Sequence, residues 1–303
     1  MPKSRITDRV REVSPEPFRL ALKLPKDVIR LSVGEPDFET PSFVKEAAKR
    51  AIDEGFTHYS PSTGYDELRV AIAAKLHLEN AIAYDHEREI LVTPGSSAGI
   101  FMALLVLVNP GDEVLVVDPA WFHYVTLIRL CGGSPVGLPV SLGHSASLDV
   151  EQAQRLITHR TKVLILNSPS NPTGMILSRD NIRALGELAE KHDLTVISDE
   201  VYEKILYPGN THTSPASLPA LRDRTITSNG LSKAYAMTGW RVGYLAGPSE
   251  IVEKITALNG YILVSPSSVS QRAAYAALTD PRMGAAVKAM VDQFSRRRTM
   301  VLE

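Results

Sequence analysis

From Glu89 onward, short apolar runs alternate with longer segments in which apolar residues recur every three or four positions. The short runs have the length and β-branched content of strands, and the longer segments have helical spacing. The expected strands are Ile90–Thr93, Glu113–Val117, Pro135–Val140, Lys162–Leu166, Leu194–Ser198, Thr225–Ser228 and Val242–Ala246. The expected helices are Ala98–Val108, Tyr124–Leu130, Val150–His159, Asn181–His192 and Ala285–Leu302.

Several of the expected strands contain continuous rather than alternating apolar residues, which is typical of a sheet covered on both faces. Strands that alternate with helices through right-handed crossovers form a doubly wound, mostly parallel α/β sheet. We therefore predict this fold for a large domain over residues 41–280. Ligands of such sheets bind beyond the carboxyl ends of the strands.

The two ends of the chain differ from this pattern. Residues 1–40 are rich in proline, and we interpret them as an N-terminal arm and part of a second, smaller α+β domain. Residues 281–303 would begin that domain again, but their helix reaches the last residue without a capping glycine or a following element. We therefore expect the second domain to be incomplete and the chain to be truncated there.

Charge and composition narrow the class of protein. The 303 residues include 33 lysines and arginines against 34 aspartates and glutamates, a net charge of −1, so we expect neither nucleic acid nor a membrane surface as partner. The apolar run at residues 98–108 is far shorter than the roughly 20 residues that cross a bilayer. One cysteine, Cys131, cannot form an internal disulfide, and the start lacks the apolar stretch of a secretory signal, so we expect a cytoplasmic protein.

Polar residues follow three of the expected strands. Ser96 and Ser97 begin a helix after the first strand and could bind an anion, or could be ordinary capping serines. Asp199 ends another strand, where a buried carboxylate requires a partner, either a bound cation or a nearby arginine. Tyr202 follows it and could equally be a core tyrosine.

The segment after strand Thr225–Ser228 contains Lys233 and Arg241 among small and aromatic residues. Partial burial would lower the pKa of the lysine, as imine formation with a carbonyl requires. A planar arginine cation suits phosphate. The glycine patterns of dinucleotide and P-loop sites are absent from the sequence, and no cysteine–histidine cluster has zinc spacing, so we expect no metal.

Five motifs occur together in one order: Gly34-Glu35-Pro36-Asp37-Phe38, Tyr59-Ser-Pro-Ser-Thr-Gly, Asn171-Pro-Thr-Gly, Ser198-Asp-Glu-Val-Tyr202, and Ser232-Lys233 followed by Gly239-Trp-Arg-Val-Gly243. In this combination the chain resembles the fold-type I, class I/II pyridoxal-phosphate-dependent aminotransferases, especially the aspartate and aromatic aminotransferases. The resemblance extends from about Arg5 to the C-terminus.

The resemblance implies roles for the residues at the centre of the site. Lys233 would hold pyridoxal 5'-phosphate as a Schiff base and then move a proton between the substrate and the cofactor. Asp199 would pair with the ring nitrogen, and Tyr202 and Asn171 would donate hydrogen bonds to the ring oxygen. The implied reaction moves an amino group between an L-amino acid and a 2-oxo acid.

The resemblance also implies the periphery of the site. Trp121 would stack on the ring, while Ser96, Ser97 and Arg241 would bind the phosphate. Tyr59 would reach the phosphate in a neighbouring subunit, so a homodimer with shared active sites is expected. The substrate would be bound by Gly34, beside its carboxylate, and by Asn171.

Three departures from the family pattern bear on activity. Gly230 stands where many relatives have a serine, and Ser97 stands where a lysine often recognises an acidic side chain, which weakens an aspartate assignment. No residue matches the arginine that clamps the substrate carboxylate. A cofactor-binding fragment without full activity is therefore one alternative that stays open. The other is a pyridoxal-phosphate-dependent lyase, acting on C–S bonds or forming aminocyclopropane-carboxylate, because such enzymes use much the same residues around the cofactor.

Overall fold

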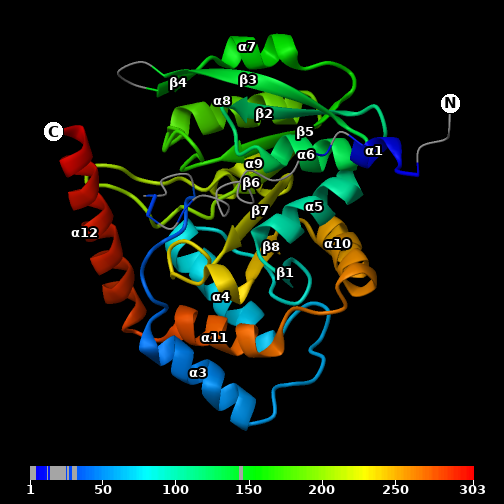
Figure 1. Cartoon of the computed structure of the whole chain (residues 1–303). Helices are drawn as coiled ribbons and strands as arrows, with labels where there is room; N and C mark the ends of the chain where they lie inside the picture. Colours follow the sequence, from blue (N-terminus) through cyan, green and yellow to red (C-terminus); the bar gives the residue numbers. More distant parts are fainter. Residues whose placement is uncertain (1–4, 12, 14–24, 26, 29–32, 143–145) are drawn as a thin grey trace.

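The structure, a computed structural model, describes residues 5–11, 13, 25, 27–28, 33–142 and 146–303 (Figure 1). Its eight strands form one sheet in the order β1-β8-β7-β6-β5-β2-β3-β4. The strands are β1 Ile90–Thr93, β2 Glu113–Asp118, β3 Ser134–Leu142, β4 Ala146–Leu148, β5 Thr161–Asn167, β6 Thr195–Asp199, β7 Thr225–Gly230 and β8 Gly243–Ala246. Strands β2, β3, β5, β6 and β7 are parallel, while β8 is antiparallel to β1 and β7, and β4 to β3. The predicted mostly parallel α/β sheet is confirmed.

Helices cover both faces of this sheet (Figure 1). Their bounds are α1 Asp8–Arg11, α3 Ser42–Asp53, α4 Asp66–Asn80, α5 Ser96–Leu107, α6 His123–Leu130, α7 Val150–Leu156, α8 Arg179–Lys191, α9 Pro219–Arg222, α10 Ser249–Ile262, α11 Ser268–Thr279 and α12 Met283–Leu302. Two short 3-10 helices lie at Pro215–Ser217 and Thr238–Trp240.

Successive residues of one strand enter different hydrophobic clusters, because side chains alternate between the faces of a sheet. Val116 and Ile165 pack with α5, α6 and α10, whereas Leu115 and Leu164 pack with α8 and α9 on the opposite face. This double burial explains why the strands read as continuous apolar runs.

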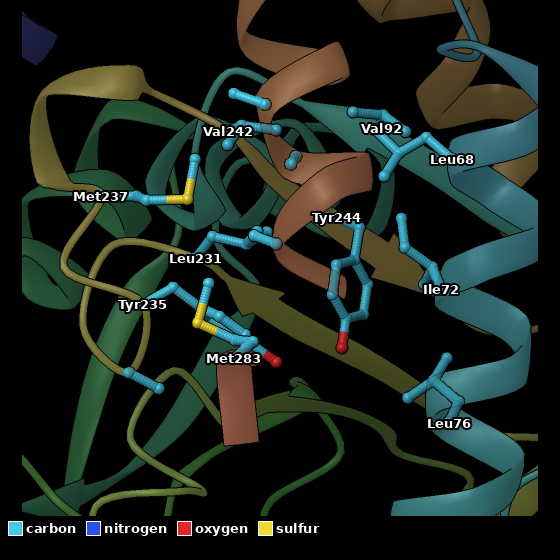
Figure 2. Close-up of a cluster of buried hydrophobic side chains, with 14 of the residues drawn as sticks. Leu68, Ile72, Leu76, Val92, Leu231, Tyr235, Met237, Val242, Tyr244 and Met283 are labelled. Atoms are coloured by element: carbon cyan, nitrogen blue, oxygen red, sulfur yellow. The ribbon is translucent and has the colours of Figure 1, made fainter. Parts of the chain in front are cut away.

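A third cluster fills the space between α4 and the β1 end of the sheet (Figure 2). Leu68, Ile72 and Leu76 line one side of α4 and face Val92 of β1 and Tyr244 of β8. Helices α3, α4, α10 and α11 were not among the elements expected from the sequence. Their packing closes this end of the sheet around the first strand.

Some predicted bounds were wrong. The helix expected at 150–159 ends at Leu156, because Thr158 and Arg160 turn back to Glu113 at the start of β2. Their hydrogen bonds to its carboxylate are both 2.6 Å long. The final strand begins at Gly243 rather than Val242.

The division into an arm over residues 1–40, a large domain over 41–280 and a second domain from 281 stays a prediction. Most of the arm lies outside the described residues. The predicted last helix is present as α12, which runs along one side of the molecule (Figure 1). Across the described residues, no helix combines the length and apolar character of a membrane span.

Candidate active site

The carboxyl ends of β5, β6 and β7 bring the predicted polar residues to one edge of the sheet. Asn167 at the end of β5 is in register with Asp199 at the end of β6 and donates a hydrogen bond of 2.9 Å to its backbone carbonyl. The backbone N–H of Asn171 in turn donates to Oδ1 of Asn167 at 2.7 Å. Hydrogen bonds between neighbouring strand ends therefore fix the loop that carries Asn171.

Asp199 is the last residue of β6 and is only 3% exposed. Burial raises the pKa of its carboxyl group to about 6, while a hydrogen bond of 2.5 Å from the Tyr124 hydroxyl partly opposes this rise. The ring of Trp121 lies edge-on to Tyr124, with centroids 5.3 Å apart. A buried carboxylate beside an aromatic wall is suited to a flat ligand that carries a positive charge.

Tyr202 and Asn171 meet one turn beyond Asp199. Nδ2 of Asn171 donates to the Tyr202 hydroxyl at 3.4 Å. Burial, together with the nearby Asp199 carboxylate, raises the pKa of Tyr202 to about 12, and the hydrogen bond from Asn171 opposes it. The phenol therefore stays protonated at neutral pH and can donate a hydrogen bond to an anionic oxygen.

Lys233 enters the same space from the loop after β7. Its Nζ lies 5.9 Å from the centroid of the Tyr202 ring and donates a 2.5 Å hydrogen bond to the carbonyl of Gly34. Burial lowers the pKa of this amine, and so does the positive charge of Arg241, while Glu35 and Asp199 act in the opposite direction. A lowered pKa favours the free amine that attacks a carbonyl carbon.

Arg241 and the start of α5 form an anion site. A Cβ added to Gly95, the residue before Ser96, would lie only 2.6 Å from Nη2 of Arg241, so the guanidinium lies directly over the helix N-terminus. Gly95 has a φ of 84°, a conformation that glycine adopts without strain. Ser96 and Ser97 then present free backbone N–H groups to the same space, as in anion sites at helix starts.

The structure thus gathers Asp199, Tyr202, Asn171 and Lys233, with Trp121, Gly34, Ser96, Ser97 and Arg241 around them. Tyr59 lies outside this group, because its side chain is 86% exposed on the loop before α4.

Gly230, at the end of β7, has room for a side chain, since an added Cβ would meet ordinary contacts of 3.4 Å or more. Steric crowding therefore does not explain the glycine at this position.

Two groups of residues near the site were not predicted from the sequence. Tyr124 carries no pattern of its own, although it follows Trp121 by three residues. Behind Asp199, the fully buried Glu200 carboxylate accepts hydrogen bonds from Ser198, Ser214 and His212 at 2.7–2.9 Å. These three partners of Glu200 lie 2 to 14 residues away from it in the sequence, and no spacing rule identifies them.

Glu200, Glu203 and His212 offer ligand atoms within 4.8 Å of one another, a spacing that a metal ion could use. These groups have protein partners. Glu203 forms a buried ion pair with Lys75 and accepts hydrogen bonds from the side-chain amides of Asn80 and Asn229 at 2.7 and 2.8 Å. We interpret the cluster as structural support for the end of β6.

A buried carboxylate, a protonated phenol, an amine of lowered pKa and an anion site at a helix start lie together here, an arrangement suited to a phosphorylated aromatic aldehyde. The class is that of the enzymes that use pyridoxal phosphate. The family model described as "Aminotransferase class I and II" matches residues 26–303. The chain belongs to this family.

Individual relatives agree with this membership. The chain is 43% identical over 299 residues to an aspartate aminotransferase of Pyrococcus abyssi, covering 98% of this chain and 77% of that protein. It is 40% identical, with the same coverage, to aromatic-amino-acid aminotransferase 2 of Thermococcus litoralis. Among solved structures, the aspartate aminotransferase of Thermus thermophilus with maleate matches with a TM-score of 0.94 at 38% identity, over 99% of this chain and 80% of that one.

Proposed function

We propose that this chain is a pyridoxal-phosphate-dependent aminotransferase that moves an amino group between an L-amino acid and a 2-oxo acid. The observation that carries the proposal is the placement of Lys233 beside Tyr202 and Asp199 at one edge of the sheet. When bound, the cofactor supplies an aldehyde that combines with amines and a ring that accepts electrons. The residues of the chain supply binding, orientation and proton transfer.

The residues fit the cofactor group by group. The Asp199 carboxylate would hold a proton on the ring nitrogen, since a cation there relieves the cost of its burial. The Tyr202 hydroxyl and Asn171 amide would bind the ring oxygen. Arg241 and the N–H groups of Ser96 and Ser97 would bind the phosphate.

Three other residues complete the proposed site. Trp121 would close one side of the ring with its aromatic face. The Lys233 amine, first as the point of attachment and then as a free base, would move the proton at the substrate carbon. Gly34 would lie beside the substrate carboxylate, because its carbonyl already contacts Lys233.

We infer that the active unit is a homodimer. Exposed apolar side chains gather near Tyr59: Tyr261 is 90% exposed, and Ile262 and Val264 follow it. The two segments are tied together, since Ser268 donates to the carbonyl of His58 and Asn259 to that of Ser62, at 2.5 and 2.7 Å. A second copy would cover this surface, which we call the Tyr59–Tyr261 patch, and would receive Tyr59 at its phosphate site.

We place the protein in the cytoplasm, where its single buried thiol, Cys131, stays reduced.

The test of the function begins with Lys233→Ala. We expect the variant to lose the near-visible absorbance that pyridoxal phosphate gives when joined to an amine, together with amino transfer. Lys204→Ala is the matched control, because Lys204 is also partly buried but pairs with Glu79. Retained absorbance and turnover in the Lys233 variant would contradict the proposal.

A donor panel then identifies the substrate. Aspartate, phenylalanine and tyrosine, each added to the cofactor-loaded protein without a 2-oxo acid, represent the amino acids for which these relatives are named. We expect conversion of the aldehyde form of the cofactor to its amine form with at least one donor. Sustained release of pyruvate and ammonia without a 2-oxo acid would instead identify a lyase.

A further inference from the structure

Residues 34–41, which we call the bridging segment, lie against the loop that carries Lys233. Gly34 accepts the hydrogen bond from Nζ of Lys233, and Glu35 accepts one from the Thr238 hydroxyl. Further along, the Thr40 hydroxyl donates to the carbonyl of Ala236 at 2.5 Å and accepts from Nε1 of Trp240 at 3.0 Å. The inner side of the segment is thus attached to the active-site loop at three points.

The outer side of the bridging segment contacts α12. Nη1 of Arg297 lies 2.8 Å from Oδ1 of Asp37, and this hydrogen bond lowers the pKa of the carboxyl group. The rings of Phe38 and Phe294 meet edge-on with centroids 5.4 Å apart, and the Arg297 guanidinium lies 5.3 Å from the Phe38 ring. We call these four residues the clasp.

The clasp is a main connection between the bridging segment and the second half of α12. The buried residues of this helix, Met283 and Met290, belong to its first half. A cavity of about 390 Å³ lies between the segment and the helix, lined among others by Phe38, Ala236 and Arg296. Close packing therefore does not hold the segment against the helix, and the polar and aromatic contacts of the clasp do so instead.

We propose that Asp37 and Arg297 are positioning residues for Lys233, which hold the bridging segment so that Gly34 and Glu35 stay beside its amine. The proposal rests on the role of Lys233 given above. Without the clasp, only the contacts on its inner side would hold the segment, so the hydrogen bond from Nζ to Gly34 would weaken and the Glu35 charge that favours the protonated amine would lose its fixed place. Both changes make Lys233 a more accessible and more reactive amine.

The test measures the reactivity of Lys233 in the full chain after removal of cofactor. Limited acetylation by acetic anhydride at pH 8, read by peptide mass spectrometry, gives the rate at Lys233 relative to the exposed Lys254. We expect Arg297→Ala to raise this ratio about threefold to tenfold, as the loss of an exposed ion pair and a cation–aromatic contact allows. The matched control is Arg298→Ala, because its guanidinium lies instead over Tyr207, 5.4 Å from the ring.

Combined variants separate positioning from general loosening. Asp37→Ala and Arg297→Ala together should raise the ratio no more than Arg297→Ala alone, since both remove the same contact. The exchanged pair Asp37→Arg with Arg297→Asp should bring the ratio back toward that of the unaltered chain. An unchanged ratio in Arg297→Ala, additive effects in the double variant, or equal acceleration at every lysine would overturn the proposal. Because no cofactor is present, these outcomes are independent of the absorbance test of Lys233→Ala.

Discussion

Replacement of Asp199 by Asn should stabilise the cofactor-free protein at neutral pH while impairing its function. Burial raises the pKa of this carboxyl group from 3.8 to about 6, so the folded state binds its proton more tightly than the unfolded state does. Stability is then greatest below pH 4 as far as this group is concerned, and falls as pH rises from 3.8 to about 6. Above that range the penalty is constant, at about 3 kcal/mol for a shift of about two units.

Asparagine has nearly the same shape, keeps an oxygen that accepts from Tyr124, and does not ionise. The gain in unfolding free energy should therefore be about 3 kcal/mol at pH 7 and about 0.5 kcal/mol at pH 4. Urea unfolding of both proteins at pH 4, 5, 6 and 7 measures this difference. Asp118→Asn is the matched control, because Asp118 ends the parallel strand β2 at the same edge but is exposed. A difference between the Asp199 variant and the unaltered chain that does not change with pH would refute the reasoning.

Two further predictions concern the proposed phosphate site at the start of α5 and the proposed dimer. Gly95→Ala should weaken cofactor binding about tenfold or more, because the new methyl group would lie 2.6 Å from the Arg241 guanidinium and alanine is strained at the φ of 84° that this position requires. Cofactor titration measures the affinity, and an unchanged affinity would argue against the proposed phosphate site. Tyr261→Asp should shift the protein toward monomers in sedimentation equilibrium, since it places a charge in the Tyr59–Tyr261 patch. An unaltered dimer, or a monomeric starting protein, would contradict the proposed interface.

The strands could be predicted because their sequences report their surroundings directly. Residues 163–166 are apolar throughout, and Val196 and Ile197 are apolar on the two faces of the next strand, so continuous apolar residues mark both segments as strands of a covered sheet. Helix α11 gives a weaker signal, because its core contacts are made by small residues such as Ala273 and Ala274. In α4 the buried face includes Lys75, whose partner Glu203 is 128 residues away, and a local pattern cannot reveal such a pairing.

Some residues of the candidate site could be predicted from the sequence and others could not. Asp199 could be identified because a carboxylate at the buried end of a strand requires a partner, and Lys233 because it lies among small and aromatic residues after the neighbouring strand; the topology brings those strand ends together. Tyr124 and the clasp residue Arg297 could not, because their significance comes from contacts across 75 and 260 residues. Sequence patterns locate chemistry that depends on strand ends, whereas contacts between distant elements require the folded chain.

The two groups placed at the centre of the site both bear a cost in the free protein. Burial disfavours the charged form of Asp199 and also that of Lys233, so each carries a shifted pKa in the direction that opposes its ionisation. The hydrogen bonds from Tyr124 and to Gly34 reduce this cost without removing it. A ligand that brings a positive charge to the carboxylate and takes up the amine relieves both groups at once. Part of the affinity for such a ligand would therefore come from the relief of unfavourable interactions in the free chain.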